Sequence, residues 1–296
     1  MDIQTVHQPV LLQSALNFLN VQPDQWYVDA TLGGGGHTLA IASLGANVIA
    51  FDQDQSAIDR LTHRLEQEPS EISNRITLIR SNFSNISSSL EEANIFHSFS
   101  GILFDLGLSS DQLQNPERGF SFLHNGPLDM RMDQSSSLTA QDIVNQWSLR
   151  DLTQLFQQAA DEPKANQIAQ LIVNARTTHN FSTTHELANL IANQIGKHSK
   201  IHPATRVFQA LRIAVNQEFP SLMNGLQSAW QVLNSNGHLV VISFHSGEDK
   251  LVKHFMTYQQ SLGSVSLTPK PIKADRHEVI NNPRARSAKL RAIEKK

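Results

Sequence analysis

"YVDATLGGGGHT", residues 27–38, places four consecutive glycines between a short apolar run and a helical pattern. A strand that ends in an acidic residue, then a glycine loop, then a helix marks the place where open α/β sheets bind nucleotides. Glycine lets the backbone approach a ligand that a Cβ atom would keep away. The stretch therefore predicts an α/β fold with a nucleotide-type site at this loop.

Apolar runs of strand length alternate with helical patterns around the loop. The expected strands are residues 26–30, 47–51, 76–79, 101–105 and 237–244, and helical patterns separate the first three. This alternation predicts βαβ units and a mostly parallel sheet covered on both faces.

Residues 106–236 break that rhythm. A loop rich in Gly, Ser, Asp and Pro is followed by helical patterns without a convincing strand. Apolar side chains recur on one face within 149–156, 168–175 and 187–195, and Thr183 and Glu186 have capping-box spacing. We predict a discontinuous α/β core formed by 1–113 and 206–296, with an all-helical insertion at 114–205.

Composition narrows the functional classes. The 296 residues are 40% hydrophobic and 17% charged, which is typical of a globular protein. The absence of cysteine excludes disulfides, thiolate metal sites and a cysteine nucleophile. Neither a secretion signal nor a membrane-spanning apolar run is visible, so we expect a cytoplasmic protein without a membrane partner.

Charge is unevenly distributed along the chain. The formal net charge is −3, yet from Lys270 onward nine Lys/Arg face three Asp/Glu. Such a basic arm is typical of a segment that meets a polyanion, and equally of a solvated, partly frayed tail. Charge alone leaves both interpretations open.

The loop sequence restricts the ligand. No Lys follows the glycines, as a P-loop requires, and the third glycine position of a dinucleotide fingerprint falls on Thr38 or Leu39. A nucleoside without a pyrophosphate remains. Asp52 ends the second expected strand, 23 residues after Asp29, where a carboxylate accepts hydrogen bonds from ribose hydroxyls. S-adenosylmethionine fits, although "DQD" at 52–54 is also good turn material.

Several longer motifs resemble one family. They are "HQPVLL" (7–12), "VDATLGGGGHT" (28–38), "DLGLSSDQL" (105–113), "ERGFSF" (117–122), "GPLDMRMD" (126–133), "HPATRVFQALRIAVNQE" (202–218), "ISFHSGED" (242–249) and "NPRARSAKLR" (282–291). In this order they resemble the bacterial 16S rRNA cytosine-N4 methyltransferases of the RsmH (MraW) type. The likeness extends over nearly the whole chain.

The resemblance implies a class I, Rossmann-like methyltransferase fold, S-adenosyl-L-methionine as donor, and a cytidine in the decoding region of small-subunit rRNA as acceptor. Its implied cofactor contacts are Gly35, Gly36, His37, Asp52, Phe83, Asp105 and Gln112. Two departures concern substrate-side detail: an acidic stretch is only partly recognisable at 159–166, and Gly247 replaces the family's Leu.

Transfer to cytosine N4 needs a group that reorients the amine, because its lone pair is delocalised into the ring. A carboxylate would accept the amine hydrogens and stabilise the developing charge. Asp105 is our candidate, with two alternatives: contact with the methionine end of the cofactor, or capping of the strand exit.

Other candidates concern the RNA. An extruded base commonly stacks on an aromatic ring, so Phe120 or Phe122 could serve, unless both are core residues; Arg118 could contact a phosphate. His245 follows the last expected strand and could face the acceptor. We do not expect a metal site there, because no second ligand cluster supports it.

Arg284 and Arg286 are the candidates for gripping rRNA phosphates. His37 is interpreted as a donor to the cofactor and not as a general base. The expected partner is 16S rRNA within the small ribosomal subunit, and an uncovered apolar face on the insertion would permit a homodimer. The competing hypotheses are a non-catalytic assembly factor that binds the subunit and a methyltransferase acting on a small molecule or protein.

Overall fold

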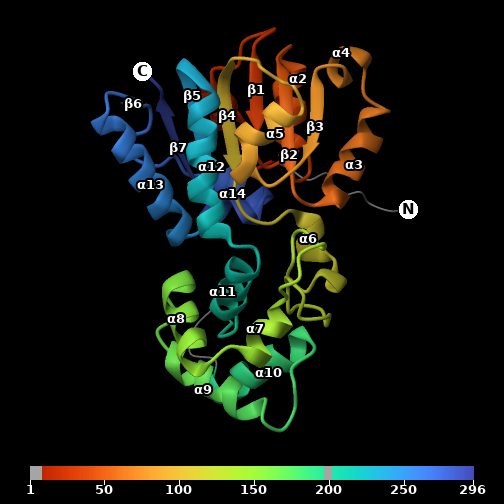
Figure 1. Ribbon diagram of the computed structural model, residues 1–296, viewed down its shortest axis with the longest axis vertical. Helices are drawn as coiled ribbons and strands as arrows, with labels where there is room; N and C mark the ends of the chain where they lie inside the picture. The colour runs from red at the N-terminus through yellow and green to blue at the C-terminus, as the bar shows by residue number, and fades with distance from the viewer. Residues whose placement is uncertain (1–8, 197–201) are drawn as a thin grey trace. The chain divides into compact units, whose positions relative to one another are not determined.

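The computed structural model describes residues 9–196 and 202–296 (Figure 1). The first two residues of the 7–12 motif lie outside them. The chain divides into two compact units, Met1–Leu108 with Phe219–Lys296 and Ser109–Glu218. Each is described by itself.

The first unit is built on one sheet. Its strands are β1 (Trp26–Asp29), β2 (Asn47–Asp52), β3 (Ile76–Arg80), β4 (Phe99–Asp105), β5 (Leu233–Ser243), β6 (Val265–Ser266) and β7 (Lys289–Glu294). The order is β3-β2-β1-β4-β5-β7-β6, parallel from β3 to β5 and antiparallel at β7 and β6. The predicted α/β class I arrangement is confirmed.

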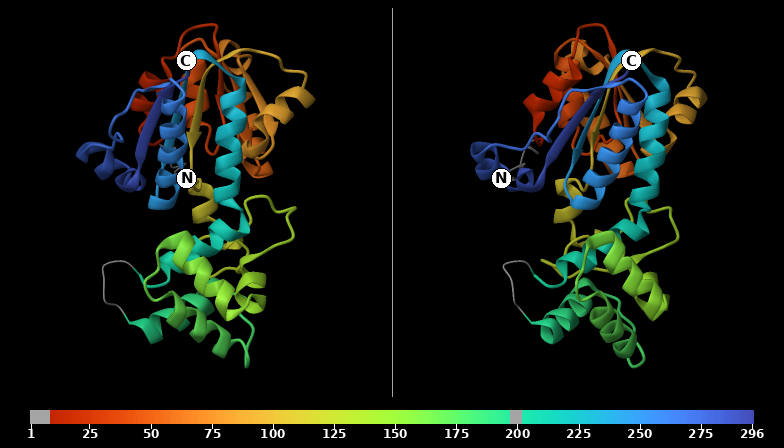
Figure 2. Two further views of the ribbon diagram at one scale, coloured as in Figure 1. Left: turned by 60° about the vertical axis from the view of Figure 1, so that its left-hand side comes forward. Right: turned by 90° about the vertical axis from the view of Figure 1, so that its left-hand side faces the viewer.

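Helices cover both faces of this sheet, as its apolar strands require. One face carries α1 (Leu12–Leu19), α2 (Gly36–Ser43) and α3 (Gln55–Leu65); the other carries α5 (Ile86–Glu92), α12 (Glu218–Val232) and α13 (Ser246–Ser261). Successive strand residues alternate between the two cores, Tyr27 entering one and Val28 the other. The two groups of helices are seen on either side of the strands in Figure 2.

Short elements complete this unit: α4 (Ser70–Ser73), η1 (Phe83–Asn85), α14 (Arg276–Asn281) and η3 (Pro283–Ser287). The interpretation of the C-terminal segment as a frayed tail is wrong. Strand β7 pairs with β5 from Lys289 opposite Ser243 to Glu294 opposite His238. Leu290 and Ala292 are fully buried, so alternate residues of the basic segment belong to the core.

The second unit is helical. Its elements are α6 (Ser110–Gln114), η2 (Pro116–Arg118), α7 (Ala140–Gln146), α8 (Leu149–Ala160), α9 (Ala165–Ala175), α10 (Thr184–Ile195) and α11 (Thr205–Val215). Within its described residues, β pairing is limited to an isolated bridge between Pro127 and Thr183. The capping box of Thr183 and Glu186 is confirmed. The placement of the insertion at 114–205 and its role in substrate recognition stay predictions.

Membrane insertion of a helix finds no support in residues 9–196 and 202–296. None of the helices there combines the length and the apolar character that crossing a bilayer demands.

Candidate active site

The glycine loop joins β1 to α2 by a backbone path that only small residues follow easily. Gly35, the N-cap of α2, has φ 76°, in the left-handed region. A Cβ on Gly36 would lie 3.0 Å from Cγ of Pro9, so the chain passes close to a neighbouring segment there. The first turn of α2 thus begins with unshielded backbone N–H groups, which suit an anionic or strongly polar ligand.

Asp29 ties the two ends of this loop together. Its Oδ1 accepts a hydrogen bond from Thr31 N (3.1 Å) and its Oδ2 one from Thr38 Oγ1 (2.7 Å). The side chain is 1% exposed. Because removing one partner of a buried carboxylate is costly, this pair fixes the loop against α2.

Asp52 ends β2 and closes the loop from the other side. Oδ2 accepts a hydrogen bond from Gly33 N and Oδ1 one from Asp54 N, each at 2.9 Å. Burial raises the pKa of Asp52 to about 6, although the two backbone donors oppose that rise. Each oxygen has further acceptor capacity, so the carboxylate is equipped to receive two ribose hydroxyls.

Asp105 ends β4, next to β1 in the sheet. Its backbone N donates to Thr31 Oγ1 at 2.6 Å, which links the strand end to the loop. Side-chain Oδ2 lies 3.5 Å from Nδ1 of His37, whose Nε2 lies 3.2 Å from the carbonyl oxygen of Val10. Within the described part of the chain, the buried Oδ1 atom has no hydrogen-bond partner.

The electrostatics of Asp105 follow from this environment. Burial raises its pKa to about 6, with nearby His37 lowering it and the like charge of Asp29 raising it further. A buried carboxylate oxygen without a partner is costly and calls for a ligand that donates a hydrogen bond or carries positive charge.

Two predicted residues flank this centre. Phe83 begins η1 after β3, with its ring centroid 5.5 Å from that of Phe104. Arg284 donates from Nη2 to the carbonyl oxygen of Leu108, and its charge offsets part of the effect of burial on the pKa of Asp105. Arg284 therefore lies near the carboxylate edge, whereas Arg286 is exposed and better placed for a phosphate.

His245 caps helix α13. Its Nδ1 accepts a hydrogen bond from Glu248 N (3.4 Å), and its Nε2 lies 3.1 Å from Glu248 Oε1. The ring is 5.9 Å from that of Phe219. A Cβ on Gly247 would lie 2.7 Å from Cζ of Phe219, so this ring occupies the space that the family's Leu would need. The imidazole has a structural role in the helix start, and contact with an acceptor stays a prediction.

Four predicted residues lie in the second unit. Gln112 shares a capping box with Ser109, accepting from its N at 3.0 Å. Arg118 is 8% exposed and donates from Nη2 to the carbonyl oxygens of residues 131 and 132. Its guanidinium also lies over the ring of Phe120, 7% exposed, at 5.8 Å. Phe122 packs against the rings of residues 202 and 208. This packing favours the core interpretation of both phenylalanines and a structural role for Arg118.

The predicted residues that the first unit brings together sit at the carboxyl edge of β1, β2 and β4. They are Gly35, Gly36, His37, Asp52 and Asp105. The same hydrogen-bond network includes Asp29, Thr31 and Thr38. The sequence showed Asp29 as an acidic residue at the end of a strand, but it did not reveal which residues bond to it. The residues fit S-adenosylmethionine. The exposed backbone of the glycine loop can receive its polar tail, and Asp52 can bond its ribose. The Asp105 oxygen without a partner can accept a cationic or N–H-bearing group.

Comparison with known proteins decides the family, because the profile of the MraW methylase family matches residues 4–296. The chain belongs to the MraW methylase family. Its relatives include proteins named "Ribosomal RNA small subunit methyltransferase H" from Thermomicrobium roseum, 45% identical over 99% of this chain and 94% of the relative. Another relative of the same name, from Rippkaea orientalis, is 44% identical over 98% of this chain and 92% of the relative. A third, from Lactiplantibacillus plantarum, is 41% identical over 98% of this chain and 97% of the relative.

Membership in the MraW methylase family confirms the resemblance that the motifs showed. The chain is a methyltransferase with S-adenosylmethionine as its donor. The roles assigned to single residues stay predictions that the geometry supports to different degrees: strongly at Asp52 and Asp105, weakly at Arg118.

Proposed function

We propose that this MraW-family methyltransferase transfers a methyl group to the exocyclic N4 amine of a cytidine in 16S rRNA. The observation that carries the proposal is the carboxylate of Asp105, which ends β4 beside the glycine loop with its buried Oδ1 lacking a partner. The names of the relatives support rRNA of the small ribosomal subunit as the substrate.

The residues of the chain position the reactants. S-adenosylmethionine supplies an electrophilic methyl group when it is bound. The Gly36 N–H holds its polar tail where Gly35, whose own N–H bonds the carbonyl oxygen of Leu32, lets the backbone come close. Asp52 accepts hydrogen bonds from its ribose, which fixes the donor and lowers the entropic part of the barrier. His37 stays in place through its contact with the carbonyl oxygen of Val10.

Asp105 acts on the acceptor side in this proposal. A carboxylate whose pKa is about 6 is mostly ionised at neutral pH, so Oδ1 accepts an N–H of the cytosine amine. That hydrogen bond strengthens as positive charge develops on N4, which stabilises the transition state more than the ground state. The alternative role, binding of the donor's ammonium group, uses the same atom.

The RNA contacts form the outer part of the proposal. Arg286 is exposed on η3 and suits a phosphate, and the helical insertion would recognise the surrounding RNA. The substrate places the protein's activity in the cytoplasm. Self-association through the insertion stays a prediction.

One experiment tests the function directly. The protein is incubated with isotope-labelled donor and either small subunits that lack the modification or free rRNA, and nucleosides are analysed by mass spectrometry. We expect label on the N4 of one cytidine. Label on another base or on protein, or no label with any substrate, would refute the proposal.

A matched variant separates the two roles of Asp105. Asp105→Asn should lower the transfer rate at saturating donor by at least about 100-fold if the carboxylate acts on N4. If it binds the donor's ammonium group, calorimetry should show the loss in donor affinity instead.

A further inference from the structure

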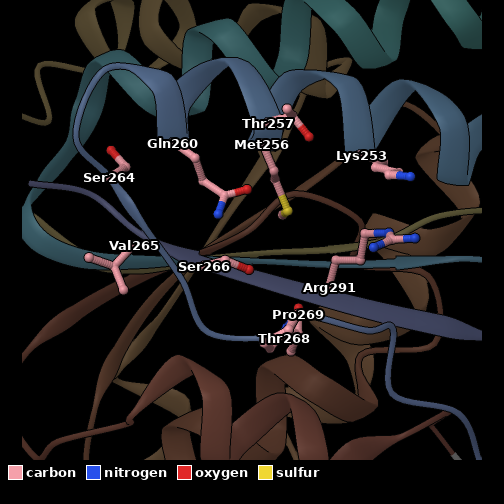
Figure 3. A pocket seen from close by; sticks show the side chains of 10 residues that line it. All are labelled: Lys253, Met256, Thr257, Gln260, Ser264, Val265, Ser266, Thr268, Pro269 and Arg291. Atoms are coloured by element: carbon pink, nitrogen blue, oxygen red, sulfur yellow. The ribbon is translucent and has the colours of Figure 1, made fainter.

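A pocket lies in the first unit, and no residue of the glycine loop lines it. It has a volume of about 600 Å³ and is bounded by α13, β6, β7 and the segment after β6 (Figure 3). Its lining contains none of the residues assigned to the donor or to N4 chemistry. A pocket of this volume is in the range of small-ligand sites, so it can admit a nucleotide-sized group.

The lining combines polar and charged residues with Met256, Val265 and Pro269. Thr257, Ser264 and Ser266 supply three hydroxyls, Gln260 an amide, and Lys253 and Arg291 two cations. The hydroxyl of buried Thr268 is bonded to the backbone of Ala292. Figure 3 shows Lys253 and Arg291 together at one end, with Gln260 and Ser264 toward the other. None of the described lining residues is acidic or aromatic, so the pocket suits an anion with hydroxyl groups and offers no stacking platform for a base.

Arg291 is held ready for such an anion. Its Nε donates to Asp249 Oδ1 at 2.7 Å, and Lys289 Nζ lies 2.8 Å from Asp249 Oδ2. Burial pushes the pKa of Asp249 up, but these two hydrogen bonds outweigh it and keep that pKa below its ordinary value. The terminal nitrogens of Arg291 have no hydrogen-bond partner in the described part of the chain.

The pair of cations on Asp249 leaves a surplus of positive charge, because one carboxylate faces two of them. An arginine whose Nε is fixed presents its other donors in a defined fork, which matches a phosphate bidentately. Lys253 is exposed on α13 and makes no hydrogen bond or ion pair with described residues. Lys253 and the terminal nitrogens of Arg291 can therefore take an incoming anion, while Arg291 Nε stays paired with Asp249.

The chain segment around the pocket is also positively charged. Residues 250–274, which run through α13 and β6, contain four lysines and no Asp or Glu, whereas the whole chain has a net charge of −3. On an acidic protein such a stretch attracts a polyanion locally, and it is continuous in sequence with the basic C-terminal segment.

We propose that this pocket is a binding site for the phosphodiester backbone of RNA. Arg291 and Lys253 contact one phosphate, and the hydroxyls and amide farther along contact neighbouring riboses, including the 2′-OH that distinguishes RNA from DNA. The absence of aromatic side chains makes this a sequence-independent contact with an RNA segment that flanks the modified base. The identity of that RNA rests on the proposed function; the site itself does not.

A charge reversal with a neighbouring control tests the site. Lys253→Glu changes the pocket, and Lys250→Glu makes the same change at an exposed lysine of the same helix that does not line it. Binding of a fluorescently labelled single-stranded RNA to the full chain is followed by anisotropy between about 50 and 200 mM salt. We expect Lys253→Glu to weaken binding roughly tenfold, and to reduce the salt slope by about 0.7, the share of one phosphate contact.

Lys250→Glu should change affinity by less than about threefold, because screened charges outside the contact contribute little. Equal losses in both variants, or no loss in Lys253→Glu, would overturn the proposal. Ser264→Trp fills the far end without changing charge and should also weaken RNA binding. The same RNA sequence made as DNA should bind less tightly and be less sensitive to Ser264→Trp.

Two further measurements separate this inference from the proposed function. If wild-type protein methylates no RNA, the function fails while the direct binding test still stands. If wild-type protein is active, Lys253→Glu should raise KM for RNA and leave kcat unchanged; an unchanged KM counts against the site. Inorganic phosphate and cytidine monophosphate are tested as competitors of the labelled RNA. If these small anions bind to the pocket but Lys253→Glu leaves the affinity for RNA unchanged, the proposed RNA site is also refuted.

Discussion

Replacing Asp105 by Asn should make the folded state more stable at neutral pH. The carboxyl ends β4 with one oxygen lacking a partner in the described residues, and burial raises its pKa from 3.8 to about 6. A group whose folded pKa is raised loses stability as the pH climbs from the unfolded value to the folded value. Asn has nearly the same shape and does not titrate, so the variant lacks that loss.

The two pKa values set the size of the effect. They differ by about 2.2, which corresponds to roughly 3 kcal/mol once the pH is well above 6. At pH 5 the penalty is about 1.6 kcal/mol, because the unfolded carboxyl has ionised while the folded one still holds its proton. The advantage of the variant should therefore grow by roughly 1.4 kcal/mol between pH 5 and pH 8.

Native-state hydrogen exchange of the β1 and β4 amides measures this difference within the first unit. Asp52 titrates in the same range, but it is present in both proteins and cancels in the comparison. A stability difference that stays constant from pH 5 to pH 8 would show that Asp105 is not desolvated as the geometry implies. Stability in favour of wild type at pH 8 would refute the reasoning altogether.

Four further substitutions test other parts of the site. Asp52→Ala should weaken donor binding at least about tenfold in calorimetry, because two charge-assisted hydrogen bonds to the ribose are lost; unchanged affinity removes Asp52 from the site. Gly35→Ala should destabilise the fold by about 1–3 kcal/mol in urea unfolding, since φ is 76° and the new Cβ would lie 2.8 Å from Leu61 Cδ1; a loss below about 0.5 kcal/mol contradicts this strain. Arg286→Ala should reduce the salt slope of RNA binding by about one phosphate contact without changing donor affinity, whereas Arg284→Ala should shift the pH dependence of donor binding; identical behaviour of the two variants would refute their separation.

The sequence was sufficient where local pattern and fold agree. The five parallel strands were predicted from apolar runs between helical patterns. The glycine loop and Asp52 were predicted to form one site because few ligands require this combination of residues. The capping box at Thr183 was readable because both of its partners lie within one helical turn.

What the sequence left open depends on contacts between distant residues. The alternation Lys289, Leu290, Arg291, Ala292 is compatible with a charged tail, and it becomes a strand because β5 offers an unpaired edge about 50 residues earlier in the chain. The sequence around Arg118 suggested a phosphate contact. It gave no sign that the guanidinium donates to the carbonyl oxygens of residues 131 and 132, which lie more than ten residues farther along the chain.

We expect the carboxylates at the sheet edge to favour a positively charged group beside them, whereas the N–H groups at the start of α2 suit a negatively charged one. Burial raises the pKa of both Asp52 and Asp105, and the like charge of Asp29 adds to that effect in each case. Three acidic groups at the ends of β1, β2 and β4 are tolerable because backbone N–H groups, Thr38 and His37 offset part of their repulsion, and the remainder favours a positively charged ligand. S-adenosylmethionine carries a sulfonium charge that its demethylated product lacks, so we expect these carboxylates to hold the donor more tightly than the product. On this reasoning, we expect the buried carboxylates to contribute to product release as well as to donor binding.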